Sequence, residues 1–160
     1  MTGDCVKNII PFIMRTAFTI ISIFSVLIAF SFTARPKNAL RDDVLKYTNE
    51  FRKAHKLSPL EMKDELNEIA QKHSKNMARG IVGFGHDGFS ERAEKVRKKL
   101  GDYMVAENVA YGIETGKAAV ELWKTSPGHR KNLLGSFKYI GIGTATDDHG
   151  NIYFTQIFAD

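Results

Sequence analysis

The chain has 160 residues, a formal net charge of +5 and one cysteine, Cys5. A single cysteine excludes a disulfide framework and, beyond the N-terminal segment, a thiolate nucleophile. The positive charges are mostly scattered and lack an aromatic-interleaved basic pattern, which excludes a nucleic-acid partner and leaves an anionic polymer or a lipid as the expected class.

An uncharged stretch of nineteen residues, Thr16–Ala34, comes first along the chain, and basic residues flank it on both sides. This arrangement is typical of a signal peptide or an N-terminal membrane anchor, and the length allows either. We therefore expect residues 1–34 to be a leader or anchor helix. Residues 35–160 are then one exported domain, either secreted or held at the outer face of the cytoplasmic membrane.

Hydrophobic periodicity after this stretch predicts helices first and strands last. Leu40, Val44, Tyr47 and Phe51 recur at spacings of three and four, which is typical of one helix face. Helices are predicted at 40–55, 62–79, 90–100, 117–124 and from Pro127, and strands at 139–146 and 151–158 around a turn at 147–150. Segment 106–112 is too short to assign. This order indicates an α+β domain with helices packed on a small antiparallel sheet.

Three residues outside the predicted core carry side chains suited to chemistry. His86 lies in a glycine-rich loop, Glu107 in a mostly apolar segment and His129 at a helix start. Two histidines and a carboxylate suit a divalent transition metal, zinc above all, with one position left for water. They equally suit a general base with an orienting carboxylate. Each residue also has a purely structural alternative. His86 could bond to the backbone of its loop, Glu107 could accept backbone N–H bonds that fix a turn, and His129 could simply belong to the start of a helix.

The stretch SPGHRKNLL, residues 126–134, predicts a helix that begins beside His129. Ser126 is a good N-cap residue, and Pro127 suits the first helical position. The positive end of the helix dipole disfavours imidazolium, so we expect a neutral His129 ring. A neutral ring can bind a metal or accept a proton.

The remaining histidines and charges are expected to be structural. His73 falls on the apolar stripe of a helix, His149 in a turn and His55 at a helix end. The basic run 92–99 predicts a solvated helix face, with a polyanion contact as the lesser alternative. Glu121 suits either the surface or the site. Nucleophile-elbow, Walker A and dinucleotide patterns are absent, so we expect neither a serine triad nor an organic cofactor.

Four stretches together resemble the CAP superfamily of cysteine-rich secretory proteins, antigen 5 and plant pathogenesis-related proteins. They are HDGFSERA from His86, AENVAYG from Ala106, ELWKTSPGHRKNLLG from Glu121, and YIGIGTA followed by YFTQIFA. They occur in the family's order across most of residues 40–160, and the chain is most similar to the bacterial SCP-like extracellular branch.

The resemblance implies an α-β-α sandwich with a central antiparallel sheet, and it implies secretion. It also implies a cleft of two histidines and two glutamates, which in several members binds a divalent cation. Three of these map to His86, Glu107 and His129. At the place where many eukaryotic relatives have the fourth, a glutamate, this chain has Ser126, and the role is not carried over to Glu121.

Three functions are compatible with these features. The first is a non-enzymatic extracellular module that acts on an envelope or outside partner, with a metal-binding cleft. The second is a zinc-dependent hydrolase that uses the same cleft. The third is a lipid or sterol carrier, which would need a deep apolar pocket. Rings of His86 and His129 more than about 5 Å apart would argue against a shared zinc ion.

Overall fold

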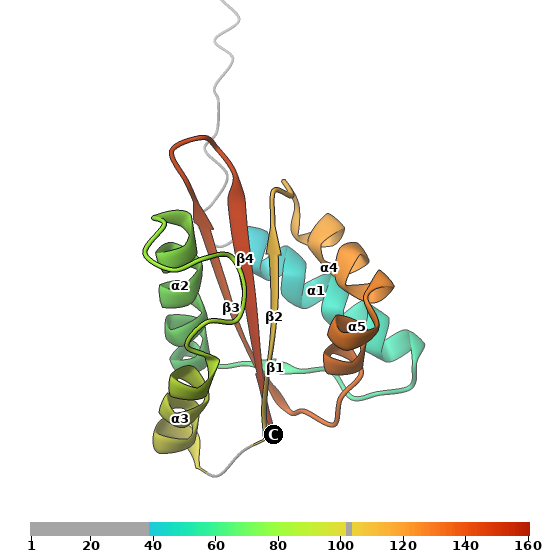
Figure 1. The fold of residues 1–160 in the computed structure, drawn as a ribbon. Helices are drawn as coiled ribbons and strands as arrows, with labels where there is room; N and C mark the ends of the chain where they lie inside the picture. The colour runs from blue at the N-terminus through green and yellow to red at the C-terminus, as the bar shows by residue number, and fades with distance from the viewer. Residues whose placement is uncertain (1–38, 102–103) are drawn as a thin grey trace, which may run out of the picture. The chain divides into compact units, whose positions relative to one another are not determined.

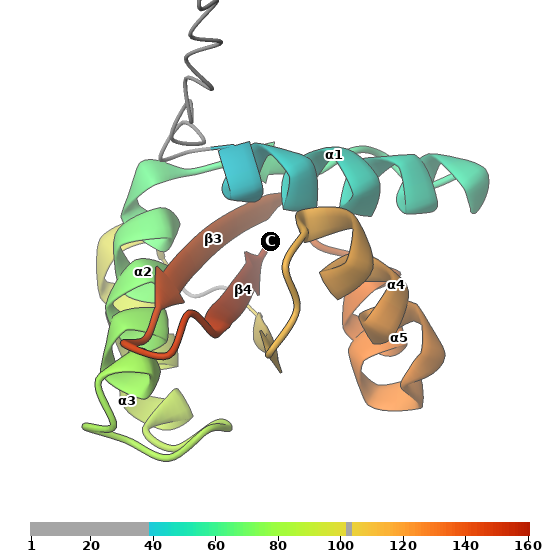
Figure 2. The same cartoon turned by 90° about the horizontal axis from the view of Figure 1, so that it is seen from above.

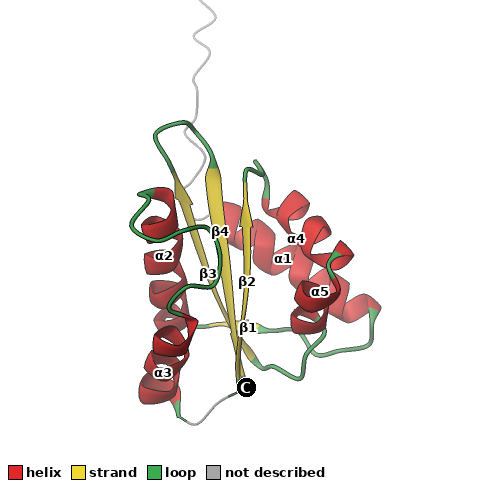
Figure 3. Ribbon diagram, viewed as in Figure 1, coloured by secondary structure: helices red, strands yellow, loops and turns green. Residues whose placement is uncertain are grey.

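A four-stranded sheet lies at the centre of the computed structural model, which describes residues 39–101 and 104–160. Its strands lie in the order β1 (Glu61–Met62), β3 (Tyr139–Thr146), β4 (Ile152–Ala159) and β2 (Val105–Tyr111). β4 pairs antiparallel with both β3 and β2, whereas the two-residue β1 pairs parallel with β3. The predicted antiparallel sheet is confirmed, and β2 forms one of its edges (Figures 1 and 3).

In the described part of the chain, five helices cover the two faces of this sheet. They are α1 (Ala39–Ala54), α2 (Asp64–Ala78), α3 (Phe89–Leu100), α4 (Gly116–Thr125) and α5 (Pro127–Leu133). α2 and α3 lie on one face, and α1, α4 and α5 lie on the other (Figures 1 and 2). This arrangement confirms the expected α-β-α sandwich.

The alternation of side chains along β4 divides the core in two. Phe154 and Phe158 are buried on the α1, α4 and α5 side, in a cluster that includes Trp123. Ile157 points the opposite way and packs in a second cluster with Leu66 of α2. Because successive strand residues face opposite sides, one strand supplies apolar side chains to both layers.

Two glycines of β3 allow α2 to lie very close to the sheet. A Cβ atom at Gly141 would lie 2.2 Å from the carbonyl carbon of Leu66. At Gly143 it would lie 2.3 Å from the carbonyl carbon of Ala70. No side chain fits at either position. The two glycines of the Gly141-Ile142-Gly143 sequence therefore allow α2 to pack directly against the sheet.

Several details differ from the sequence-based expectations. The unassigned segment forms β2. α3 begins one residue before Ser90, after a left-handed Gly88 (φ 72°). Ser126 occupies the N-cap of α5 as predicted, but its hydroxyl makes no capping hydrogen bond.

The predicted leader, residues 1–34, lies outside the described residues. Within the described ranges, no helix combines the length and apolar character needed to cross a bilayer.

Candidate functional site

The edge strand β2 brings the three predicted site residues together. Glu107 lies on this strand opposite Ile157, so its side chain is on the α2 and α3 side of the sheet. His86 lies in the loop between α2 and α3, and His129 lies in α5 on the other side of the edge. His86 Nδ1 is 2.9 Å from Glu107 Oε1, and the rings of His86 and His129 have centroids 6.4 Å apart.

The Glu107 carboxylate is buried and its two oxygens are held by Arg92. Arg92 donates from Nε to Oε2 at 2.7 Å and from Nη2 to Oε1 at 2.7 Å. The expectation that residues 92–99 form a solvated face is therefore wrong for Arg92. The reason is that Arg92 lies on the inward face of this amphipathic helix, where its guanidinium neutralises the buried carboxylate of Glu107. Arginine suits this role because its planar guanidinium can donate to both oxygens of a carboxylate at once.

His86 is oriented by this carboxylate. A carboxylate paired with Arg92 only accepts hydrogen bonds, so Nδ1 of His86 is the donor in this contact and Nε2 is the ring nitrogen left for another partner. The His86 side chain is 49% exposed, whereas that of Glu107 is 1% exposed. A buried carboxylate thus orients a half-exposed histidine, an arrangement common behind metal-binding imidazoles.

His129 has a buried nitrogen with no partner. Its Nδ1 is the one buried side-chain nitrogen or oxygen, among the described residues, that makes no hydrogen bond. Burial lowers the pKa of His129, and the nearby His86 lowers it further. The direction agrees with the neutral ring expected from the sequence, and burial is its largest cause. An unpaired buried acceptor or donor is costly, so this nitrogen is suited to an external partner.

Two asparagines connect α5 to β2 behind the histidines. Asn132 Nδ2 donates to the Glu107 carbonyl at 3.1 Å and to Asn108 Oδ1 at 2.9 Å. Asn108 Nδ2 in turn lies 3.3 Å from the His129 carbonyl and 3.1 Å from Gln156 Oε1. Sequence reasoning did not single out these residues, although Asn108 and Asn132 lie within the ENVAYG and SPGHRKNLL stretches.

His73 supports the loop that carries His86. As predicted, it is buried on the inner side of α2. Its Nε2 donates to the Gly85 carbonyl at 2.9 Å and lies 3.9 Å from Glu107 Oε1. Burial lowers the pKa of His73, while the hydrogen bond to Gly85 and the charge of Glu107 oppose that shift. His73 therefore belongs to the site, a role that its place on an apolar stripe had hidden.

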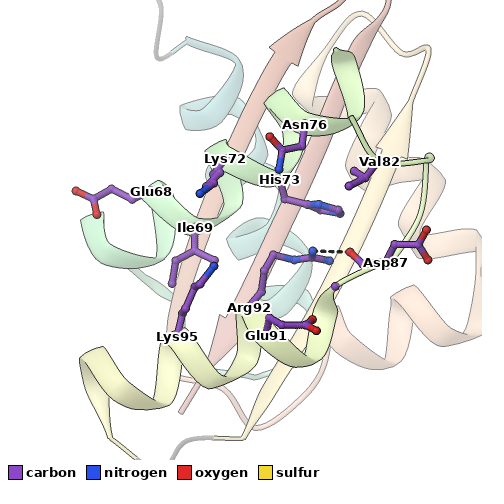
Figure 4. Close-up of a pocket in the computed structure, with 11 residues that line it drawn as sticks. Glu68, Ile69, Lys72, His73, Asn76, Val82, Asp87, Glu91, Arg92 and Lys95 are labelled. Carbon is purple, nitrogen blue, oxygen red and sulfur yellow. Dashed lines mark hydrogen bonds between the residues drawn. The ribbon is translucent and has the colours of Figure 1, made fainter. Parts of the chain in front are cut away.

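Two hollows flank the Glu107–Arg92 pair. One, of about 300 Å³, is lined by residues that include His86, Glu107 and Asn132. The other, of about 450 Å³, lies between α2 and α3, and His73 and Arg92 are in its wall (Figure 4). Most of the side chains that line this second hollow are charged.

Other predicted candidates lie away from the site or take no part in it. Glu121 is exposed and pairs with Lys124 at 2.6 Å, so it is a surface residue. His149 is exposed in the β3–β4 turn, and His55 is exposed at the end of α1. Ser126 lies at the N-cap position of α5, where its side chain makes no capping hydrogen bond.

The donors present fit a two-histidine metal site better than a three-ligand one. No group of three or more His, Cys, Asp or Glu residues in the described ranges is arranged to hold a metal ion. Glu107 is already held by Arg92. The 6.4 Å between ring centroids exceeds the limit of about 5 Å set above for a shared zinc ion. The unpaired His129 nitrogen and the oriented His86 nevertheless supply two imidazoles of the right chemistry.

A comparison with protein families shows which family this chain belongs to. The model described as the cysteine-rich secretory protein (CAP) family matches residues 45–158. The chain belongs to the CAP family. Its resemblance on four sequence stretches is thereby confirmed.

Two curated relatives come from Bacillus subtilis. The uncharacterized membrane protein YlbC is 37% identical over 119 residues, which cover 72% of this chain and 33% of YlbC. The uncharacterized protein YkwD is 32% identical over 123 residues, which cover 74% of this chain and 47% of YkwD. The chain thus spans less than half the length of either relative.

Solved structures share the fold. An extracellular protein of Bacillus anthracis with an SCP domain has a TM-score of 0.62 at 30% identity, covering 74% of this chain and 39% of that one. An outer surface protein of Borrelia burgdorferi has a TM-score of 0.68 at 22% identity, covering 79% and 96%. The chain therefore shares its fold with an extracellular protein and with an outer surface protein.

Proposed function

We propose that this CAP domain is a non-enzymatic extracellular binding module whose cleft holds a divalent transition-metal cation between His86 and His129, once the two rings move closer than their present centroid separation of 6.4 Å. The observation that carries the proposal is the buried, unpartnered Nδ1 of His129 beside an oriented His86. A neutral imidazole nitrogen is a preferred ligand for zinc, copper and nickel.

Glu107 has an orienting role in this proposal. Its carboxylate holds His86 Nδ1, and Arg92 compensates the carboxylate charge. Mutation of a residue that hydrogen-bonds to a metal-binding histidine typically lowers metal affinity by about 10- to 100-fold. A bound cation would supply a positive centre to which an acidic or carbonyl group of an envelope partner can bind.

The hydrolase alternative has less support. Hydrolysis needs a carboxylate or imidazole free to take a proton from water. Both oxygens of Glu107 are engaged by Arg92, and both imidazoles are ligands of the proposed cation, so neither kind of group is left to take that proton. The carrier alternative would need the hollow between α2 and α3, whose wall mixes apolar surface with charged residues such as Arg92 and Lys95.

Zinc titration of the full chain in an uncharged detergent tests the proposal. We expect His86→Ala and His129→Ala each to weaken zinc binding at least about tenfold. His149→Ala, which removes an exposed histidine in the β3–β4 turn, is the matched control and should bind like the wild type. Equal affinity in all four proteins would overturn the metal proposal.

An activity assay separates binding from hydrolysis. The same preparation is incubated with casein and with peptidoglycan, with and without zinc. We expect no turnover that depends on His129. Zinc-dependent cleavage that disappears in His129→Ala would replace the binding module by the hydrolase.

A further inference from the structure

The hollow between α2 and α3 has room for a small molecule and shares no lining residue with the hollow beside His86. Its volume of about 450 Å³ lies within the range of ligand sites. Ile69 and Val82 contribute apolar surface to its wall. The wall also carries six charged side chains (Figure 4): Glu68, Lys72, Asp87, Glu91, Arg92 and Lys95.

The loop that forms one side of this hollow is held in place by side chains of both helices. From α2, His73 Nε2 donates to the Gly85 carbonyl at 2.9 Å. From α3, Arg92 Nη1 donates to the Asp87 carbonyl at 2.7 Å. The hollow is therefore formed in advance of any ligand, which lowers the entropic cost of binding.

Two of the six charges are compensated within the domain. Arg92 is neutralised by the buried carboxylate of Glu107, and Glu68 Oε2 lies 2.9 Å from Lys99 Nζ. The Asp87 carboxylate points away from the hollow toward the outside of the loop (Figure 4). The charges left to face a ligand are two lysines and one glutamate: Lys72, Lys95 and Glu91.

Both lysines lack the ion pair that their position in a helix allows. Glu68 precedes Lys72 by four residues and Glu91 precedes Lys95 by four, a spacing at which such pairs form. Lys98 does pair with the acid four residues before it, at 2.7 Å. Among the described residues, neither Lys72 nor Lys95 makes an ion pair. Two like charges that line one hollow favour an anionic group between them.

The antiparallel packing of α2 and α3 separates the basic and acidic groups. The Glu68–Lys99 pair joins the start of α2 to the end of α3. Further along, Lys72 and Lys95 line the same part of the hollow (Figure 4). Glu91 lies one turn nearer the loop, about 6 Å from Lys95 along the helix axis. The hollow therefore has a basic end and an acidic end about one helical turn apart.

We propose that this hollow binds a dipeptide with free termini and apolar side chains. Two residues of extended chain span about 7 Å, so the terminal carboxylate can lie between Lys72 and Lys95 while the ammonium group lies at Glu91. The peptide side chains then contact Ile69 and Val82. A free amino acid carries both charges on one carbon and is too short to reach both ends. The inference goes beyond the cation cleft and does not depend on it.

NMR titration of the full chain with leucyl-leucine, in an uncharged detergent and without added metal, tests the proposal. We expect saturable shifts of amides in α2 and α3. Leucyl-leucinamide lacks the carboxylate and N-acetyl-leucyl-leucine lacks the ammonium group, and each should bind at least about fivefold more weakly. Free leucine that binds as tightly as the dipeptide would overturn the peptide assignment.

Substitutions at the two ends of the hollow locate the site. In Lys72→Met/Lys95→Met, leucyl-leucine and leucyl-leucinamide should bind equally, because the carboxylate has lost its partners. In Glu91→Gln, leucyl-leucine and its acetylated form should bind equally. Lys53→Met/Lys98→Met changes two exposed lysines outside the hollow and should keep both preferences. Absence of saturable binding, or a preference for a free terminus that survives the loss of its partner, would overturn the proposal.

Discussion

Arg92 holds both carboxylate oxygens of Glu107, with Nε and Nη2 each 2.7 Å from its oxygen partner. This pair joins α3 to the edge strand β2 beneath the histidine cleft. The same Arg92 donates from Nη1 to the Asp87 carbonyl at 2.7 Å, one residue from His86. Arg92 therefore fixes the position of α3 relative to both β2 and the loop that carries His86.

Removing Arg92 alone should be strongly destabilising. Arg92→Met leaves a buried carboxylate without its compensating charge, which typically costs about 3–5 kcal/mol. The double variant Arg92→Met/Glu107→Gln removes both charges and should recover much of that loss. Denaturation followed by the fluorescence of Trp123, the chain's one tryptophan, measures both. A double variant no more stable than the single one would contradict this account.

Stability should fall as the pH falls below neutrality, in part through His73. Burial lowers the pKa of His73 in the folded state, so the unfolded chain binds the proton more readily. The stabilising contribution is complete above the unfolded pKa of about 6.5 and is lost as the pH falls through the lower folded pKa. Urea denaturation from pH 8 to pH 5 should show a shallower decline in His73→Gln than in the wild type. His149→Gln should leave the wild-type slope, and identical slopes in all three proteins would exclude the effect.

A side chain at Gly143 should displace α2. Its Cβ would lie 2.3 Å from the backbone of Ala70, so Gly143→Ala should cost about 3 kcal/mol or more. Gly128→Ala is the control, because a Cβ there meets no atom within 4 Å. That change in α5 should be neutral or stabilise by up to about 1 kcal/mol. Similar denaturation midpoints for the two variants would disprove the close approach.

Asn108 should affect both stability and metal binding. Asn108→Ala removes the links to Asn132 and to the His129 carbonyl, which should cost about 1–3 kcal/mol and weaken zinc binding. Asn49→Ala removes a comparable amide that bonds to Leu60 in both directions, away from the cleft. It should lower stability without changing zinc affinity. Equal zinc affinity in the two variants would leave Asn108 with a structural role only.

Much of the fold could be predicted because its signals are local. Apolar spacings of three and four marked α1 and α2, and β-rich runs around Asp147–Gly150 marked the final hairpin within one or two residues. β2 was missed as a strand because its seven residues are too short for periodicity to separate strand from helix. The predicted capping role of Ser126 held for its position but not for its hydroxyl.

The candidate site was predictable only in part. His86, Glu107 and His129 stood out because polar residues with metal-binding chemistry interrupt loops and apolar segments, and the CAP resemblance grouped them. Arg92 and His73 did not stand out, because a helical charge run or apolar stripe looks the same whether or not one member reaches a buried carboxylate.

The sequence alone predicted the five helices, the final hairpin and the family, and it singled out His86, Glu107 and His129, because each of these rests on a local pattern. The tertiary structure decided which charges are buried and paired. Arg52 is an example: it is buried and donates to the carbonyls of Leu133 and Gly135, more than eighty residues away. The physical reason is that a buried cation or amide is stable only where distant backbone groups converge on it, and that convergence exists only once α1, α3, α5 and the sheet have packed.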